Sequence, residues 1–154
     1  MEQNAAFTLK QATVDELDVI AELFDQYRVF YKEQSDFQGA KDFIHERFVH
    51  HESIIFLAYA ADGGQAIGFA QLYPSFSSTN MARLWILNDL YVTPEARGLG
   101  TGRGLLQAAK EYAQKTKACG LTLATAVDNF NAQKLYESSG YVKDDEFYFY
   151  NLML

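Results

Sequence analysis

Residues 97–104 read RGLGTGRG and lie between a predicted strand and the longest predicted helix of the chain. Because glycine lacks a Cβ atom, the backbone N–H groups of such a segment can turn toward one point, and a bulky anion can approach them closely. The helix that follows adds the positive end of its dipole, and Arg97 and Arg103 can form charge-assisted hydrogen bonds to the same anion. A tight turn without a ligand needs fewer glycines. The segment therefore favours a phosphate-binding turn.

Two common phosphate motifs do not fit this segment. A P-loop requires a Lys-Ser or Lys-Thr pair after its last glycine, and none follows here. A dinucleotide fingerprint requires G-x-G-x-x-G, but counting from Gly98 or Gly100 the last position falls on Arg103 or Leu105. The segment is therefore neither a P-loop nor a dinucleotide fingerprint.

Hydrophobic periodicity and turn residues divide the rest of the chain into strands and helices. Apolar residues at three- and four-residue spacing predict helices over 15–31, 37–51, 99–117 and 131–138, the first of them opened by a capping box between Thr13 and Glu16. Apolar and β-branched runs predict strands over 6–12, 53–61, 65–73, 84–92, 121–127, 140–142 and 146–154, with a hairpin turn at 62–64. This order predicts one mixed α/β domain over residues 1–154, with one strand-helix-strand crossover.

Charge and composition narrow the classes of function. The chain has 20 acidic and 13 basic residues, and its net charge of −7 disfavours the phosphate contacts that supply most nucleic-acid affinity. No stretch reaches the roughly 20 apolar residues of a membrane span, and the first residues do not resemble a signal peptide, so we expect a cytoplasmic protein without a membrane partner. The three histidines and Cys119 lack zinc spacing, so we expect no metal and a buried, apolar role for the cysteine.

Two segments in order resemble one enzyme family. Residues 90–102, LYVTPEARGLGTG, resemble the acetyl-CoA-binding signature of the GCN5-related N-acetyltransferases, and residues 129–141, NFNAQKLYESSGY, resemble the second signature of that family, with Tyr141 in place of a phenylalanine. The resemblance covers essentially the whole chain. It implies a mixed, mostly antiparallel sheet with flanking helices, in which a bulge in the fourth strand splays it from the fifth and opens a wedge.

The same resemblance implies acetyl-CoA as co-substrate. The main-chain groups of Leu90 and Val92 would hold the pantetheine arm, Asn129 would contact the cofactor, and the hydroxyl of Tyr136 would reach its sulfur. The pyrophosphate would rest on the glycine turn, where the matching positions are Arg97, Gly98, Leu99, Gly100, Gly102 and Arg103.

Three residues are candidates for the chemistry of acetyl transfer to an amine. The ordinary pKa of a tyrosine hydroxyl is near that of an alkyl thiol, so the hydroxyl of Tyr136 can donate a proton to the leaving thiolate; the alternative for Tyr136 is an ordinary packing residue. The N–H of Leu90 can stabilise the oxyanion. Asp89 can accept the proton of the amine through water, or instead make local hydrogen bonds at a strand end.

The acceptor is expected to be a primary amine on a small cationic molecule. Residues 1–60 hold 11 acids and 5 bases, an excess that either attracts a cation or serves solubility. We expect the acceptor to be a polyamine, a lysine-like amine or a basic protein tail, with an aminoglycoside or a protein N-terminus as alternatives within the enzyme class. The residues expected around it are Tyr31, Glu33, Asp36 and Asp89.

Two alternatives concern the whole protein. A regulatory module that binds CoA without catalysis is the alternative to an enzyme, and the presence of Tyr136 argues against it. The aromatic run at 147–150 is expected either in the core or at the edge of a homodimer, because an exposed apolar strand invites pairing.

Overall fold

The structure is a computed structural model that describes residues 6–61 and 64–154. The chain forms two compact units, an N-terminal unit (Met1–Ala124) and a C-terminal unit (Thr125–Leu154). The strands of the N-terminal unit are β1 (Phe7–Gln11), β2 (Ile54–Ala60), β3 (Ala66–Ser77), β4 (Ala82–Val92) and β5 (Gly120–Thr122). Its helices are α1 (Leu17–Phe30), α2 (Phe37–Val49) and α3 (Thr101–Lys115), with short 3₁₀ turns η1 (Val14–Glu16) and η2 (Pro94–Ala96).

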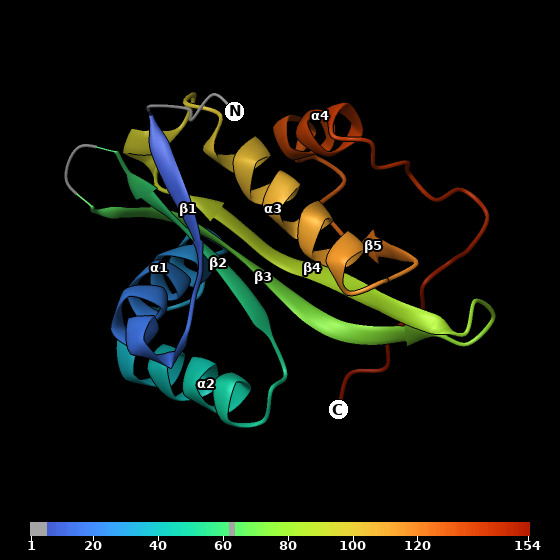
Figure 1. Cartoon of the computed structure of the whole chain (residues 1–154), viewed down its shortest axis with the longest axis horizontal. Coiled ribbons are helices and arrows are strands. Elements are labelled where there is room, and N and C mark those ends of the chain that lie inside the picture. Colours follow the sequence, from blue (N-terminus) through green and yellow to red (C-terminus); the bar gives the residue numbers. More distant parts are fainter. Residues whose placement is uncertain (1–5, 62–63) are drawn as a thin grey trace. The chain divides into compact units, whose positions relative to one another are not determined.

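The five strands form one sheet in the order β1-β2-β3-β4-β5 (Figure 1). The first three pairings are antiparallel, and β4 pairs with β5 in parallel after the crossover through α3. This confirms the predicted mixed, mostly antiparallel sheet. It also confirms the antiparallel pairing of β2 with β3, where Gly64 has a φ of 65° and the Ala60 N–H donates to Gln65 O at 2.8 Å. Residues 62–63 of the predicted turn lie outside the described residues.

Helices cover both faces of this sheet. Phe69 of β3 contacts the rings of Phe24 and Tyr27 of α1, and α1 packs against α2. On the opposite face, Phe56 of β2 contacts Tyr112 of α3. The N-terminal unit is thus a helix-sheet-helix sandwich, with α1 and α2 on one face and α3 on the other (Figure 1).

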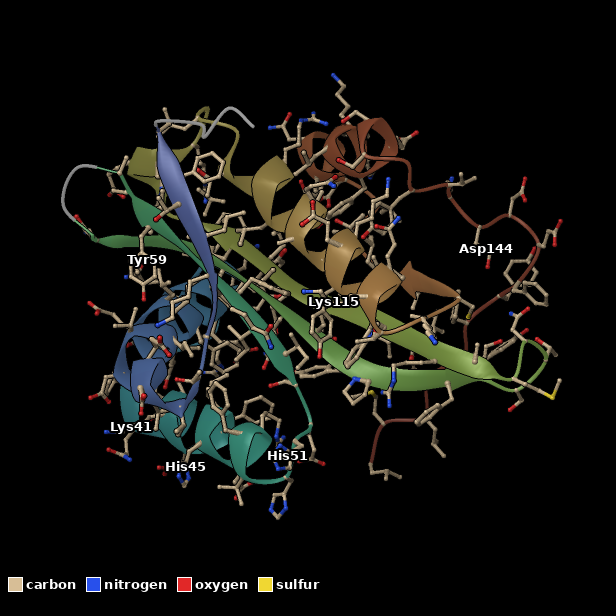
Figure 2. The ribbon with its side chains drawn as sticks, viewed as in Figure 1. Lys41, His45, His51, Tyr59, Lys115 and Asp144 are labelled. Atoms are coloured by element: carbon tan, nitrogen blue, oxygen red, sulfur yellow. The ribbon has the colours of Figure 1, made fainter. Side chains whose placement is uncertain are left out.

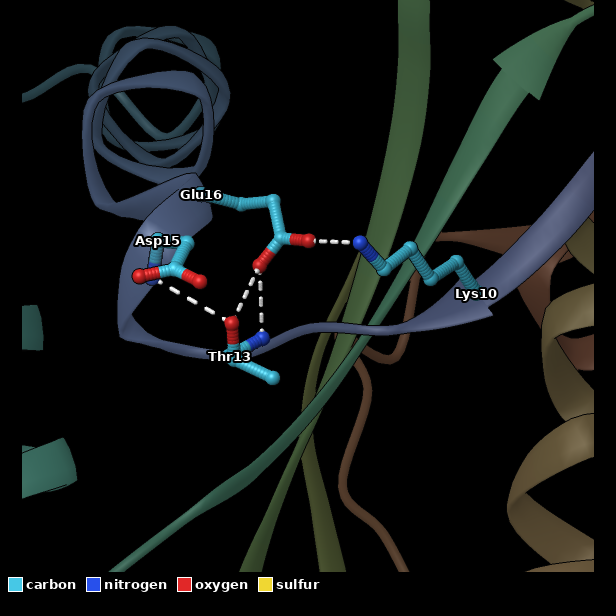
Figure 3. A network of polar contacts seen from close by, with 4 residues as sticks. All are labelled: Lys10, Thr13, Asp15 and Glu16. Carbon is cyan, nitrogen blue, oxygen red and sulfur yellow. Dashed lines mark hydrogen bonds and ion pairs between the residues drawn. The ribbon is translucent and has the colours of Figure 1, made fainter.

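A polar network fixes the start of α1 (Figure 3). The Thr13 N–H donates to Glu16 Oε2 at 2.7 Å, the Asp15 N–H donates to Thr13 Oγ1 at 3.2 Å, and Lys10 of β1 forms an ion pair with Glu16. The predicted capping box is therefore confirmed. The hydrogen bond from Lys10 lowers the pKa of Glu16 to about 2, and those from Thr13 add to the effect.

A β-bulge reverses the facing of side chains halfway along β4. Gln71 of β3 pairs with Asp89 and its neighbour Leu72 pairs with Leu87, so Asn88 is an extra residue in β4. Trp85, before the bulge, contacts Tyr112 of α3 with ring centroids 5.3 Å apart. Without the bulge, the following residues at alternate positions would also face α3. Because of the bulge, they face α1.

The pairing of β4 with β5 ends before this bulge. Only Leu84, Trp85 and Ile86 have partners in β5, so the strand expected over 121–127 is paired over Gly120–Thr122 alone. The part of β4 from the bulge to Val92 pairs with β3, and no strand among residues 6–61 and 64–154 pairs with its other edge. β4 therefore has the free edge that the implied wedge requires.

The C-terminal unit contains one helix, α4 (Phe130–Ser138), within the described residues. Asn129 caps it, since its Oδ1 accepts a hydrogen bond from the Ala132 N–H at 3.2 Å. The strands expected at 140–142 and 146–154 are not formed. Apolar runs favour strands, but a strand also needs a pairing partner, and the large side chains from Phe147 to Leu154 are 72–114% exposed.

No helix among residues 6–61 and 64–154 has both the length and the apolar composition that a membrane-spanning helix requires.

Candidate active site

The glycine turn joins η2 to the first turn of α3. Gly98 and Gly100 have φ angles of 85° and 84°, a left-handed conformation that side chains with a Cβ rarely adopt. Gly100 is the N-cap of α3 and offers no side-chain cap for the N–H groups of the first turn. A Cβ at either glycine would meet no described atom within 4 Å, so the turn borders open space. An uncapped helix N-terminus beside open space fits the phosphates of a CoA molecule.

Gly104 has a different role from the other glycines of this segment. A Cβ built on it would lie 2.7 Å from Cε2 of Phe7 in β1, which is closer than atoms can approach. Gly104 thus lets α3 pack against the first strand. Gly104 was expected to contribute to an anion-binding turn with the other glycines, and the structure gives it a packing role instead.

Arg97 links the turn to β4 and α1. Its Nε donates to Val92 O at 3.2 Å, and its guanidinium lies 5.4 Å from the centre of the Phe30 ring.

Leu90 and Val92 belong to the part of β4 that has no partner strand on the β5 side. Alternate residues of such an edge direct their main-chain N–H and C=O groups away from β3, as the pantetheine arm of CoA requires, although Val92 O already accepts from Arg97.

Asp89 lies in a buried polar cluster on the face covered by α1. Asp89 is only 3% exposed, and the neighbouring Gln71 is fully buried. Gln71 Nε2 donates to Asp89 Oδ2 at 2.5 Å and lies 3.2 Å from the Tyr73 hydroxyl oxygen, while Asn88 Nδ2 donates to Asp89 Oδ1 at 3.2 Å. Asp89 is therefore a buried carboxylate held by its neighbours and not a strand-end residue.

The cluster perturbs the titration of two of its members. Burial raises the pKa of Asp89 above the ordinary range of a carboxyl group, although hydrogen bonds from Gln71, Tyr27 and Asn88 oppose this. Burial and the negative charge of Asp89 raise the pKa of Tyr73, with Arg47 of α2 acting in the opposite direction. Asp89 therefore has a raised proton affinity, which favours the acceptance of a proton by its carboxylate.

Aromatic residues of α1 connect this cluster to the surface. The Tyr27 ring lies 6.3 Å from that of Tyr91 and 4.9 Å from that of Tyr31. Phe30 contacts Tyr31 at 5.2 Å, and both are about half exposed. The structure thus joins Tyr31 to Asp89 through Tyr27.

The two acids expected near the acceptor have other contacts. Asp36 caps α2, since its Oδ1 accepts from the Gly39 N–H at 2.9 Å. Glu33 lies in the connection between α1 and α2 and has Arg28 as an ion-pair partner at 4.0 Å. Both are exposed. The structure does not bring either side chain to the Asp89 cluster by any of these contacts.

Gln71 and Tyr73 were missed by the sequence analysis. Both lie in an apolar strand that reads AIGFAQLY at residues 66–73. The signal was available, because a glutamine in the middle of a buried strand must find hydrogen-bond partners. Its partner could not be inferred, since the register of β3 against β4 depends on the bulge.

The remaining site residues lie in the C-terminal unit or on the surface. Tyr136 belongs to α4, and its ring lies 6.0 Å from that of Tyr141. Figure 2 shows His45 on the side of α2 that faces away from the sheet and His51 beyond the end of that helix. The described segments hold no group of three His, Cys, Asp or Glu side chains suited to a metal. Cys119 is exposed, so the expectation that it is buried was wrong.

The sequence profile of the acetyltransferase (GNAT) family matches residues 17–141. The chain belongs to this family. The acetyltransferase is 49% identical over 144 residues to an uncharacterized N-acetyltransferase, YhfO, of Bacillus subtilis, a match that covers 94% of this chain and 95% of the relative. Both the fold and the enzyme class predicted from the sequence are confirmed.

Solved structures agree with this assignment. The crystal structure of a probable acetyltransferase is 45% identical, with a TM-score of 0.91 over 96% of this chain and 97% of the other. An aminoglycoside N-acetyltransferase, AAC(6')-Iy, solved in complex with CoA, shares the fold at 19% identity, with a TM-score of 0.78 over 96% and 95% of the two chains. This protein is therefore an N-acetyltransferase, and acetyl-CoA is the co-substrate that membership of the family implies.

Proposed function

We propose that this acetyltransferase transfers the acetyl group of acetyl-CoA directly to a primary amine of a cationic small molecule, such as a polyamine or a lysine-like amine, or of a basic protein tail. The observation that carries the proposal is the buried Asp89 carboxylate, joined through Tyr27 to exposed aromatic rings of α1. A carboxylate attracts an ammonium group, and aromatic faces bind cations. The excess of acids over bases in residues 1–60 supports the same class of acceptor.

The cofactor site is assigned by the motif and by the open turn. The N–H groups between Gly98 and Arg103 hold the pyrophosphate together with Arg97, and the free edge of β4 at Leu90 and Val92 holds the pantetheine arm. Leu99, Gly100 and Gly102 complete the turn, and Asn129 contacts the cofactor. The bound acetyl-CoA supplies an activated acetyl group as a thioester.

Three groups of the protein then act on the transfer. Asp89 accepts a proton from the ammonium nitrogen through a bridging water, which leaves a neutral amine that can form the new N–C bond. The Leu90 N–H donates to the acetyl oxygen as it gains negative charge. As the C–S bond breaks, the nitrogen loses its second proton to water and the Tyr136 hydroxyl donates its proton to the sulfur. Solvent later returns a proton to Tyr136 and removes one from Asp89, so that one proton is released overall.

Screening amines against the purified protein at fixed acetyl-CoA, with thiol release as the readout, tests the proposal. Polyamines and lysine-like amines should react faster than neutral or acidic amines, and kcat/KM should fall as salt is added, because mobile ions screen over about 8 Å at 0.15 M. Asp89→Asn should lower kcat/KM by about 10²–10⁴-fold. Asp18→Asn, which neutralises an exposed acid of α1, is the control and should change it little.

Other outcomes point elsewhere. Preference for an acidic amine, or a rate for the best acceptor that salt does not change, contradicts a cationic acceptor. Binding of CoA without thiol release from any amine supports the alternative of a CoA-binding regulatory module.

The organisation of the protein in the cell is part of the same proposal. We place it in the cytoplasm, where acetyl-CoA is available, and we propose that residues 1–154 act as one acetyltransferase domain. The exposed aromatic run from Phe147 to Tyr150 supports a homodimer. Sedimentation of the full chain measures this directly.

A further inference from the structure

Gln71 is a fully buried polar residue whose side chain is tied to Asp89. It lies in the middle of β3, and the register of β3 against β4 places it directly opposite Asp89. Its Nε2 is within hydrogen-bond distance of two oxygens, one of Asp89 at 2.5 Å and that of the Tyr73 hydroxyl at 3.2 Å. The two contacts to one nitrogen fix the plane of the amide and therefore the carboxylate oxygen that it reaches.

The other end of the same amide argues against a purely structural role. Gln71 Oε1 is buried and has no hydrogen-bond partner among the described residues. An apolar side chain of the same length would fill this space without leaving an acceptor unpaired, so packing alone does not favour glutamine here. What glutamine provides and an apolar residue does not is an N–H donor to Asp89.

We propose that Gln71 is a positioning residue, which holds the Asp89 carboxylate in the orientation that accepts the proton of the acceptor amine. The inference rests on the proposed function of Asp89. Gln71 acts through Asp89 and does not itself take the proton. Gln71 donates to one carboxylate oxygen of Asp89, Oδ2. The second oxygen, Oδ1, which Asn88 contacts, is then the one available to the water that carries the proton.

The pH dependence separates this role from a structural one. Asp89 must be ionised to accept a proton, so kcat/KM falls as the pH drops through its pKa. An N–H donor stabilises the ionised form, and its removal therefore moves that fall to higher pH. The polar and charged groups that act on Asp89 and its cluster from the surrounding elements are Gln71 and Tyr73 of β3, Asn88 of β4, Tyr27 of α1 and Arg47 of α2.

The experiment compares pH profiles of kcat/KM for the best amine found in the screen. Gln71→Met, which keeps the length of the side chain and loses the donor, should move the acidic limb up by about one pH unit. Gln71→Asn, whose shorter amide cannot reach Asp89 in the same geometry, should move the acidic limb in the same direction. This variant replaces Gln71→Met in the experiment if the methionine variant does not fold. Leu72→Met, a buried neighbour on the opposite face of β3, is the matched control and should leave the limb in place.

The outcomes are distinct. A limb that stays in place in a folded Gln71 variant, while its melting temperature falls, overturns the positioning role and leaves Asp89 as the base. A limb that persists in Asp89→Asn overturns the proposed role of Asp89 and the inference with it. A limb that is lost in Asp89→Asn and shifted upward in both Gln71 variants supports both.

Discussion

Trp85 and Tyr91 lie on opposite faces of the sheet, although they are an even number of positions apart on one strand. Trp85 contacts Tyr112 of α3, and Tyr91 contacts Tyr27 of α1. In a regular strand both side chains would point to the same face. The extra residue Asn88 reverses the alternation between them and thereby turns Asp89 toward α1. The same bulge places Asp89 in its buried cluster and coincides with the end of the pairing between β4 and β5.

Gly100→Ala should weaken CoA binding more than its backbone strain explains. The added methyl group meets no atom of the protein, so the variant should fold, but it enters the space beside the N–H groups of the turn. Gly64→Ala is the matched control, because Gly64 also has a positive φ and open space around it but lies in the connection between β2 and β3. Both variants should lose similar stability, about 1 kcal/mol.

Titration calorimetry with CoA distinguishes the two variants. Gly100→Ala should raise the Kd tenfold or more, by about 1.4 kcal/mol or more, and Gly64→Ala should leave it unchanged. Equal CoA affinity in both would remove the phosphate site from the turn.

Tyr136→Phe should lower turnover without changing CoA affinity. The substitution removes only the hydroxyl and keeps the ring, and loss of a general acid lowers rates by about 10²–10⁴-fold. Single-turnover rates at saturating acetyl-CoA measure the chemical step. Tyr141→Phe is the control in the same unit, since its hydroxyl is buried with no described hydrogen-bond partner and its loss should leave the rate unchanged. A Tyr136→Phe enzyme as fast as its parent would assign protonation of the sulfur to another group.

Glu16→Gln should destabilise the protein at neutral pH and cease to do so in acid. The pKa of Glu16 is about 2 in the folded protein, below its ordinary value of 4.5, so its ionised form stabilises the fold above about pH 4.5. This stabilisation is lost as the pH falls from about 4.5 to 2. Urea unfolding should show a loss of about 1 kcal/mol at pH 7, which shrinks across that range. The exposed Asp42, replaced by Asn, is the control, and a pH-independent difference would show that Glu16 acts without its charge.

Local patterns in the sequence predicted most of this fold correctly. The capping box at Thr13, the hairpin of β2 and β3 and the helix after the glycine turn each depend on residues close together in the chain. The strands expected at 121–127 and 146–154 failed because strand formation depends on a partner that the segment itself does not specify. β5 pairs with β4 over three residues only, and the terminal segment is exposed.

The candidate site depends on both kinds of signal. The glycine turn and Asp89 could be singled out because their neighbours in sequence carry the signal, and their roles in binding and catalysis stay predictions. Gln71 was missed because its importance comes from a register that a single inserted residue, Asn88, sets between two strands. The role of Gly104 was misjudged for the same reason, because Phe7 is distant in sequence.

The contact between Gly104 and Phe7 also has a consequence for the order of folding. It packs the start of α3 against the first strand, so the glycine turn depends on two segments that are far apart in the sequence of the N-terminal unit. Contacts between such distant segments form late, because the long intervening chain must first be closed into a loop. During synthesis on the ribosome, β1 can pair with β2 early, but its contact with Gly104 must wait for α3. The nascent chain should therefore acquire affinity for CoA only after α3 has left the exit tunnel.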